Sequence, residues 1–200
     1  MPLPSNPFRR TAVSAAAAGL LIALTGGCGA PDAAGPAAHR TAPGASRPAD
    51  APKAPAPARL TVPSLHIDSE LLRLGLNEDG TVEVPPAEKG MTAGWYAGGA
   101  VPGEPGAAVL IGHNDTRFGK AVFHDLHAIA EGADIAVSDG GGKETHFTVT
   151  GTETVAKDAF PTDKVYGATG ERVLRLITCD GDFDAAGHPV DNLIVYAALR

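Results

Sequence analysis

The sequence has little cysteine, few aromatic residues and no excess of basic side chains. Its two cysteines, Cys28 and Cys179, are too few for a disulfide scaffold or for a four-cysteine zinc site. Lysine and arginine number 16 against 23 acidic residues, giving a formal net charge of -7. This balance argues against nucleic acid as a partner, because phosphate binding requires a surplus of cations. Aromatic residues make up 5% of the chain, so the core must be mainly aliphatic.

The chain also lacks an apolar run long enough for a membrane-spanning helix, which needs about 20 residues. The uncharged stretch at residues 11–25 is shorter; Arg9 and Arg10 precede it, and two glycines and Cys28 follow it. A positive start and a short apolar run are typical of an export signal, and small residues before a cysteine resemble a bacterial lipobox. We predict that residues 1–28 direct export. Lipidation of Cys28, an uncleaved signal anchor and a cleaved signal are the alternatives.

Residues 29–58 are mostly Ala, Pro and Gly and contain no Leu, Ile, Val or aromatic residue. Such a segment buries too little apolar area to offset the entropy of ordering it, so we expect it to be disordered. Its dense prolines favour extended conformations of about 3.1 Å per residue, which suits a tether between a membrane and a folded domain. A low-complexity tail without a role is the alternative.

Residues 59–200 alternate short apolar segments with turn residues, as a β-barrel does. The apolar spacing of residues 121–129 predicts a short helix, and residues 69–76 fit either a strand or a helical turn. The sequence therefore predicts an all-β domain, a closed or nearly closed barrel with one or two short helices. We expect its strands at residues 59–63, 81–84, 107–111, 135–138, 146–154, 173–179 and 193–199.

Two residues at predicted strand ends could carry chemistry. Cys179 ends the strand at 173–179 and, once Cys28 is lipidated or removed, has no intramolecular partner. It is either a small buried hydrophobe or a nucleophile at the barrel rim. His113 follows the strand at 107–111, and imidazole is the usual partner that activates a thiol. Because 66 residues separate the two, only the fold can bring them together.

Several short motifs resemble those of the sortases, above all the class F sortases of high-GC Gram-positive bacteria. Residues 176–179 (LITC) resemble the family's Leu-x-Thr-Cys nucleophile motif, and residues 112–115 (GHND) its Gly-His-x-Asp motif. Residues 59–63, 94–96 and 191–196 also look like class F landmarks and come in the expected order. The resemblance spans essentially the whole of the predicted domain.

The resemblance implies a sortase-type eight-stranded β-barrel and a cysteine transpeptidase that needs no cofactor. Cys179 would be the nucleophile and His113 the general acid and base. The substrates would be surface proteins with a C-terminal LPxTG-like sorting signal, cleaved through an acyl-thioester. The acceptor would be an amine of a peptidoglycan precursor or of a pilin. The enzyme would be exported and anchored by its N-terminus to the outer face of the cell membrane.

The sequence departs from the family at one position. Sortases also use an arginine on the strand after the nucleophile, but the only arginine beyond Cys179 is Arg200, the last residue. Arg175 is a candidate replacement because it shares a strand face with Cys179, at a distance of roughly 13 Å. Asn192 is a second candidate, as a neutral donor. Trp95 could line a peptide groove or simply anchor the core.

Other readings of the sequence compete with this one. Acidic residues at positions 180, 182, 184 and 191 partly imitate a calcium loop, but position 185 is Ala rather than Gly and no helices flank it. His124 and His127 have no evident third ligand, so we expect no metal site. Two functional alternatives are an anchored barrel that binds wall components with an inert cysteine, and a sortase-like domain with little turnover.

Overall fold

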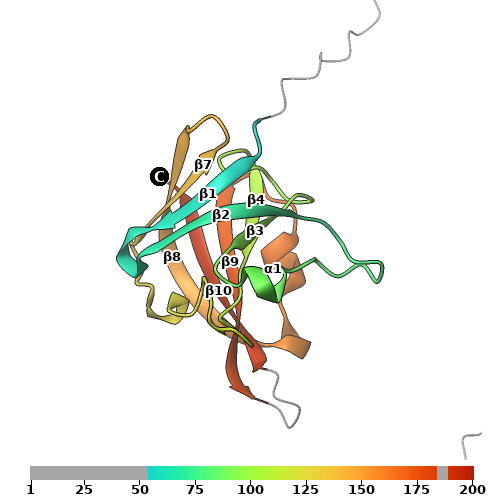
Figure 1. The fold of residues 1–200 in the computed structure, drawn as a ribbon. Helices are drawn as coiled ribbons and strands as arrows, with labels where there is room; N and C mark the ends of the chain where they lie inside the picture. Colours follow the sequence, from blue (N-terminus) through green and yellow to red (C-terminus); the bar gives the residue numbers. More distant parts are fainter. Residues whose placement is uncertain (1–53, 184–188) are drawn as a thin grey trace, which may run out of the picture. The chain divides into compact units, whose positions relative to one another are not determined.

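The computed structural model describes residues 54–183 and 189–200, apart from the side chains of residues 182 and 183. Eight of its strands form one closed barrel in the order β1-β2-β3-β4-β9-β10-β8-β7 (Figure 1). The pairs β2–β3 and β4–β9 are parallel, and the other pairs are antiparallel. The predicted all-β barrel is confirmed. Its strands are β1 (Pro57–Val62), β2 (Ile67–Leu74), β3 (Ala93–Tyr96), β4 (Gly106–Ile111), β7 (Asp134–Asp139), β8 (Glu144–Ala156), β9 (Arg172–Phe183) and β10 (Pro189–Leu199).

Most of the predicted strands are present, and residues 69–76 prove to belong largely to strand β2. The strand expected at residues 81–84 is wrong, because only an isolated bridge between Leu76 and Val82 forms there. Beyond the barrel strands, the described part of the chain contains a small hairpin, short 3-10 turns and one α-helix. The hairpin consists of β5 (Asp115–Thr116) and β6 (Gly119–Lys120), and the helix is α1 (Thr162–Tyr166).

The helix predicted at residues 121–129 is also wrong. This segment consists of turns, with a 3-10 helix only at Leu126–Ala128. The apolar spacing reflects burial instead: Val122, Leu126 and Ile129 all lie in the barrel interior. A periodic apolar pattern over nine residues shows which side chains are buried, but it does not distinguish a helix from a chain of turns.

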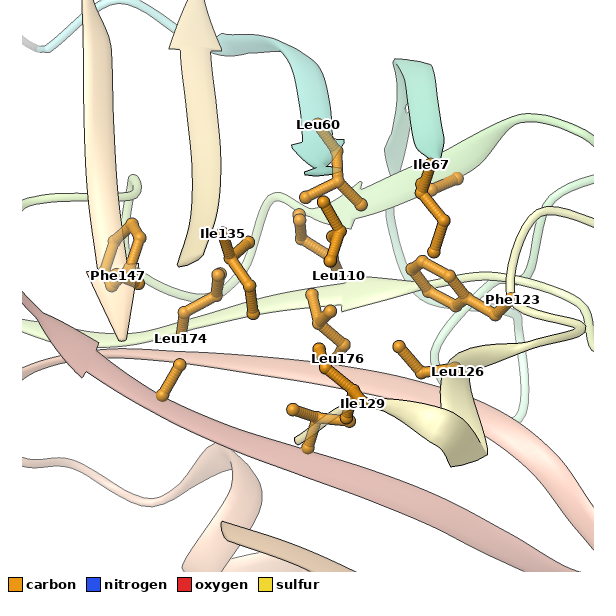
Figure 2. Packing of buried hydrophobic residues seen from close by; sticks show 14 of the residues in the cluster. Leu60, Ile67, Leu110, Phe123, Leu126, Ile129, Ile135, Phe147, Leu174 and Leu176 are labelled. Atoms are coloured by element: carbon orange, nitrogen blue, oxygen red, sulfur yellow. The ribbon is translucent and has the colours of Figure 1, made fainter. Parts of the chain in front are cut away.

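The barrel interior is filled by aliphatic side chains, as the low aromatic content requires. Alternate residues of each strand point inward, for example Leu174 and Leu176 of β9 and Leu110 of β4, all fully buried. Figure 2 shows these side chains meeting Leu60, Ile135 and Phe147 from other strands. The segment at residues 121–129 contributes further side chains to the same cluster.

A second apolar layer covers part of the outer barrel surface. It contains the outward-facing residues between the interior ones, including Val109 and Ile111 of β4, Ile177 of β9 and Ile194 of β10. Val165 of α1 is fully buried against them. Strands β4, β9 and β10 are therefore buried on both faces over part of their length, which makes this side of the barrel a rigid support.

Two expectations concern residues that the structure does not describe. The predicted export segment and most of the predicted tether fall within residues 1–53, and both remain predictions. Strand β1 begins at Pro57, just inside the boundary expected for the tether. Within residues 54–183 and 189–200, no helix is both long enough and apolar enough to cross a membrane.

Candidate active site

Strand β9 carries Cys179 on the outer face of the barrel. The expectation that Cys179 ends its strand is wrong, because pairing with β10 continues β9 to Phe183. Side chains alternate along a strand. Leu176 and Thr178 are buried, with Leu176 in the interior cluster, whereas Ile177 belongs to the outer layer. Cys179 follows Ile177 in this alternation, and its free thiol is partly exposed. A thiol on a rigid strand that solvent can reach meets two requirements of a nucleophile.

His113 follows the end of β4, close to where this strand pairs in parallel with β9. Their register pairs Ile111 with Ile177, and the amide of Gly112 donates to the Ile177 carbonyl at 3.1 Å. Two residues beyond this pair come His113, just past the end of β4, and Cys179, still within β9. The fold therefore brings together the two segments that the sequence motifs single out.

The backbone around His113 is held tightly. A Cβ atom on Gly112 would come within 2.6 Å of the Phe123 ring, so this position has no room for a side chain. The Phe123 amide donates to the His113 carbonyl at 2.9 Å. On the other side, Nδ2 of Asn114 donates to the Cys179 carbonyl at 3.2 Å. The Asn114 bond ties the segment of His113 directly to strand β9, a contact that the sequence motifs do not reveal.

Asn192 faces Cys179 from the neighbouring strand β10. The antiparallel register pairs these two residues directly, and the next pair is Leu193 with Thr178. Since Leu193 points into the interior, Asn192 points outward, on the same face as Cys179. Directly opposed residues have Cβ atoms about 4.5–5.5 Å apart, so the amide lies within reach of chemistry at the thiol. Cys179 thus lies between Asn192 on β10 and the segment just past the end of β4 that carries His113.

His113 has a further neighbour that the sequence does not reveal. Its Nε2 atom lies 2.6 Å from the carbonyl oxygen of Pro85, a buried residue of the β2–β3 connection. Because a carbonyl oxygen only accepts, Nε2 is the donor in this bond. The imidazole is therefore oriented by the backbone of a loop 28 residues earlier in the chain.

Arg175 occupies a different environment from the one its spacing suggested. Its guanidinium lies over the Tyr196 ring, 4.7 Å from the centroid, and donates to the Leu174 carbonyl at 3.1 Å. Burial lowers its pKa, although a guanidinium stays charged at neutral pH. The side chain is therefore engaged four residues along β9 from Cys179. Arg200 is farther away, at the opposite end of β10, where it pairs with Asp134 at 3.7 Å.

Next to Tyr196, Glu153 and Lys164 satisfy one another. Its hydroxyl donates to Glu153 at 2.8 Å, and Lys164 donates to the same carboxylate at 2.5 Å. The Lys164 bond and the Tyr196 bond lower the pKa of Glu153, and the Glu153 carboxylate in turn raises the pKa of Lys164. Burial, and after it the bond to Glu153, raises the pKa of Tyr196. This cluster is an ion-paired surface patch beside Arg175.

Trp95 does not line a groove, contrary to the substrate-binding role considered for it. Its side chain is only 3% exposed and belongs to the interior cluster. The indole Nε1 donates to the Ala100 carbonyl at 3.1 Å, so its polar atom is satisfied inside the protein. In this structure Trp95 is a core residue, which was the other reading of the sequence.

In the part of the chain that the structure describes, no group of three or more His, Cys, Asp or Glu side chains could hold a metal ion. His124 instead lies 3.1 Å from the Asp115 carboxylate and 3.9 Å from that of Asp125. The acidic stretch that imitates a calcium loop falls partly on residues 184–188, outside the described residues.

Comparison with known proteins shows the family and the fold of this chain. The family model described as the sortase domain matches residues 60–200, well over half of the chain. No curated protein matches the sequence. Among solved structures, sortase C-1 from Actinomyces oris is 23% identical with a TM-score of 0.56, over 72% of this chain and 71% of that one. Sortase A from Corynebacterium diphtheriae is 20% identical with a TM-score of 0.57, over 73% and 61% of the respective chains.

Proposed function

The chain belongs to the sortase family of cysteine transpeptidases, and on that premise we propose that Cys179 is its nucleophile and His113 its general acid and base. The observation that supports the proposal is the position of Cys179, with Asn192 as its direct partner on β10 and the segment of His113, just past the end of β4, on the other side of β9. The sequence motifs at residues 112–115 and 176–179 favour a class F-like member of the family.

The first half of the proposed reaction forms an acyl-enzyme. The Cys179 thiolate attacks the carbonyl carbon of the scissile peptide bond in an LPxTG-like sorting signal. The C–S bond forms, and the carbonyl oxygen takes up negative charge. When the C–N bond breaks, the departing amine takes a proton from His113. The acyl group remains on Cys179 as a thioester.

The second half transfers the acyl group to a new amine. The acceptor amine, from a peptidoglycan precursor or a pilin, loses a proton to His113 as it attacks the thioester. The C–N bond forms, the C–S bond breaks, and the thiolate is restored. Water in place of the amine gives hydrolysis instead of transfer.

We assign the stabilisation of the oxyanion to Asn192 rather than to Arg175. Asn192 is the direct partner of Cys179 on β10, whereas the Arg175 guanidinium is engaged with Tyr196 and the Leu174 carbonyl. A neutral amide aimed at the developing charge supplies a fixed dipole, which is the principle of an oxyanion hole. Arg175 takes this role only if its side chain leaves both contacts.

The substrates and the setting follow from the same proposal. Surface proteins with a C-terminal sorting signal supply the acyl group, and the enzyme works at the outer face of the cell membrane, attached through residues 1–28. Mass spectrometry of the protein extracted from membranes tests this attachment. A lipid on Cys28 supports the lipoprotein form, an intact N-terminus the signal anchor, and a shortened chain without lipid the secreted form.

The activity is tested with a quenched fluorescent LPxTG-type peptide library, with and without an added amine acceptor. We expect cleavage by the full-length protein, a ligated product when the amine is present, and neither with Cys179→Ala. Cleavage that persists in Cys179→Ala would overturn the assignment of the nucleophile. Peptide binding without turnover in the wild type would favour the alternative of a sortase-like barrel that only binds.

A further inference from the structure

The hydrogen bond between His113 and the Pro85 carbonyl decides which ring nitrogen is available for proton transfer. At 2.6 Å it is a short contact, and it engages Nε2 as the donor. A neutral imidazole carries one proton, so a proton held on Nε2 leaves the lone pair on Nδ1. The partner of one ring nitrogen thus fixes the role of the other.

The Pro85 carbonyl is presented by a stretch of chain with little freedom. Pro85 is buried, and the next residue is also a proline, with φ -58° and ψ 142°. A residue that precedes proline is restricted to extended conformations, so two consecutive prolines fix the direction of the carbonyl between them. Neither proline has an amide hydrogen that could form a competing bond.

Contacts on both sides hold this stretch against the barrel. Before it, the Glu83 carboxylate accepts a bond from the Gly75 amide at 2.6 Å. After it, the Gly90 carbonyl accepts one from the Val122 amide at 2.9 Å, beside the histidine segment. Glu88 also pairs with Arg117 of the hairpin that follows His113. The carbonyl that meets His113 is therefore part of an anchored element rather than the tip of an unattached loop.

We propose that the Pro85 carbonyl positions His113, so that Nδ1 is the nitrogen that exchanges protons with Cys179 and the substrate. The inference rests on the proposed role of His113 as acid and base. A backbone carbonyl here does what the third member of a catalytic triad does, because it fixes the orientation and the tautomer of the imidazole. Pro85 is a positioning residue, since it acts through His113.

The hydrogen bond is tested by NMR of the full-length protein labelled with 15N-histidine, which needs no substrate. The His113 signals are assigned by their loss in His113→Gln. We expect a proton on Nε2 that exchanges with solvent more slowly than those of exposed histidines, with cross-relaxation to the prolines at 85 and 86. A neutral ring protonated on Nδ1, or an Nε2 proton that exchanges freely, would overturn the proposal even if the enzyme is active.

The functional consequence is tested with Pro85→Gly/Pro86→Gly, which frees the carbonyl while keeping it in the chain. We expect a loss of the slow Nε2 proton and a fall in kcat of about tenfold or more, with KM nearly unchanged. The matched control is Pro102→Gly, in the connection between β3 and β4, which should change neither quantity. A double variant that is faster than wild type would contradict the proposal, because Pro85 would then obstruct His113.

The NMR and kinetic experiments distinguish a failure of this inference from a failure of the proposed function. If wild-type protein cleaves no peptide, the proposed function fails while the NMR experiment still tests the hydrogen bond. If the wild type is active and the double variant retains full kcat with both ring nitrogens in fast exchange, the function stands. In that case the positioning role of Pro85 is overturned.

Discussion

Two positions on the outer face of β9 hold polar side chains in opposite ways: Cys179, at what we call the reactive end, and Arg175, at the charged end. At the reactive end, Cys179 is partly exposed between Asn192 of β10 and the segment of His113, just past the end of β4. At the other end, Arg175 is packed on Tyr196, next to a lysine and a glutamate that neutralise each other. Charge alone therefore does not locate the reactive site. The end with the accessible thiol, near an imidazole and an amide, is suited to chemistry. The end with the ion-paired side chains is suited to stability.

The largest effect we expect comes from the reactive end. His113→Ala should lower kcat/KM for peptide cleavage by about 10²–10⁴-fold, because the departing amine loses its proton donor. His124→Ala is the control, since that imidazole lies near Asp115 and Asp125 and plays no part in the proposed reaction. Cleavage assays with the same peptide compare the two variants. If His113→Ala and His124→Ala differ little, the two-residue mechanism is incorrect.

The next prediction compares the two ends directly. Asn192→Ala should reduce kcat by about 10²–10³-fold, as removal of an oxyanion donor does. Arg175→Gln should leave kcat nearly unchanged while lowering the melting temperature, because it removes the cation packed on Tyr196. Steady-state kinetics and thermal unfolding of both variants give the answer. A larger fall in kcat for Arg175→Gln than for Asn192→Ala would assign the stabilisation of the oxyanion to Arg175.

A third prediction concerns the backbone that supports His113. Gly112→Ala places a Cβ atom 2.6 Å from the Phe123 ring and 2.7 Å from Val122, both buried. We expect a loss of about 1–3 kcal/mol in the free energy of unfolding, as for other overpacked cores, together with reduced activity. Gly170→Ala, where no atom lies within 4 Å of the added Cβ, is the control in urea unfolding. Equal stability of both variants would show that the segment is looser than described.

The smallest effect belongs to the charged end. The bond from Lys164 and then the bond from Tyr196 lower the pKa of Glu153, so its ionised form favours the folded state. That contribution is present above the unfolded pKa of glutamate, about 4.3, and disappears as the pH falls through the lower folded pKa. The difference in melting temperature between wild type and Glu153→Gln should therefore be constant near neutral pH and shrink below about pH 4. A difference that persists in acid would indicate packing rather than charge.

The barrel could be predicted from the sequence because most of its strands contain short apolar or alternating segments bounded by turn residues. Strand β3 (Ala93–Tyr96) was not predicted, since it is short and glycine surrounds it. The apolar spacing at 121–129 correctly indicated burial but not a helix, because the segment contributes to the core from consecutive turns. The local apolar pattern identifies which residues are buried. Tertiary contacts determine the backbone conformation of the segment that carries them.

The residues of the candidate site also fall into those that the sequence predicts and those that only the fold reveals. Cys179 and His113 could be found from short motifs, and the register of β4 with β9 brings their segments together. The strand of Cys179 is longer than its apolar run suggests, because β9 continues to Phe183. The contacts made by Asn114 and Pro85 could not be found, since they depend on how a loop and a turn pack against those strands. Arg175 shows the limit of counting along a strand, because a residue on the correct face can still direct its side chain to another partner.

In the proposed reaction the Cys179 thiol forms a covalent bond to the substrate, and mass spectrometry of the intact protein detects such a bond. Full-length enzyme is mixed with an LPxTG-type peptide, quenched in acid within its first turnovers, and digested to locate any adduct. We predict a mass increase equal to that of the N-terminal fragment acid less one water, located on Cys179, and none in Cys179→Ala. Peptide cleavage without such an adduct, or equal cleavage by the alanine variant, would contradict the account.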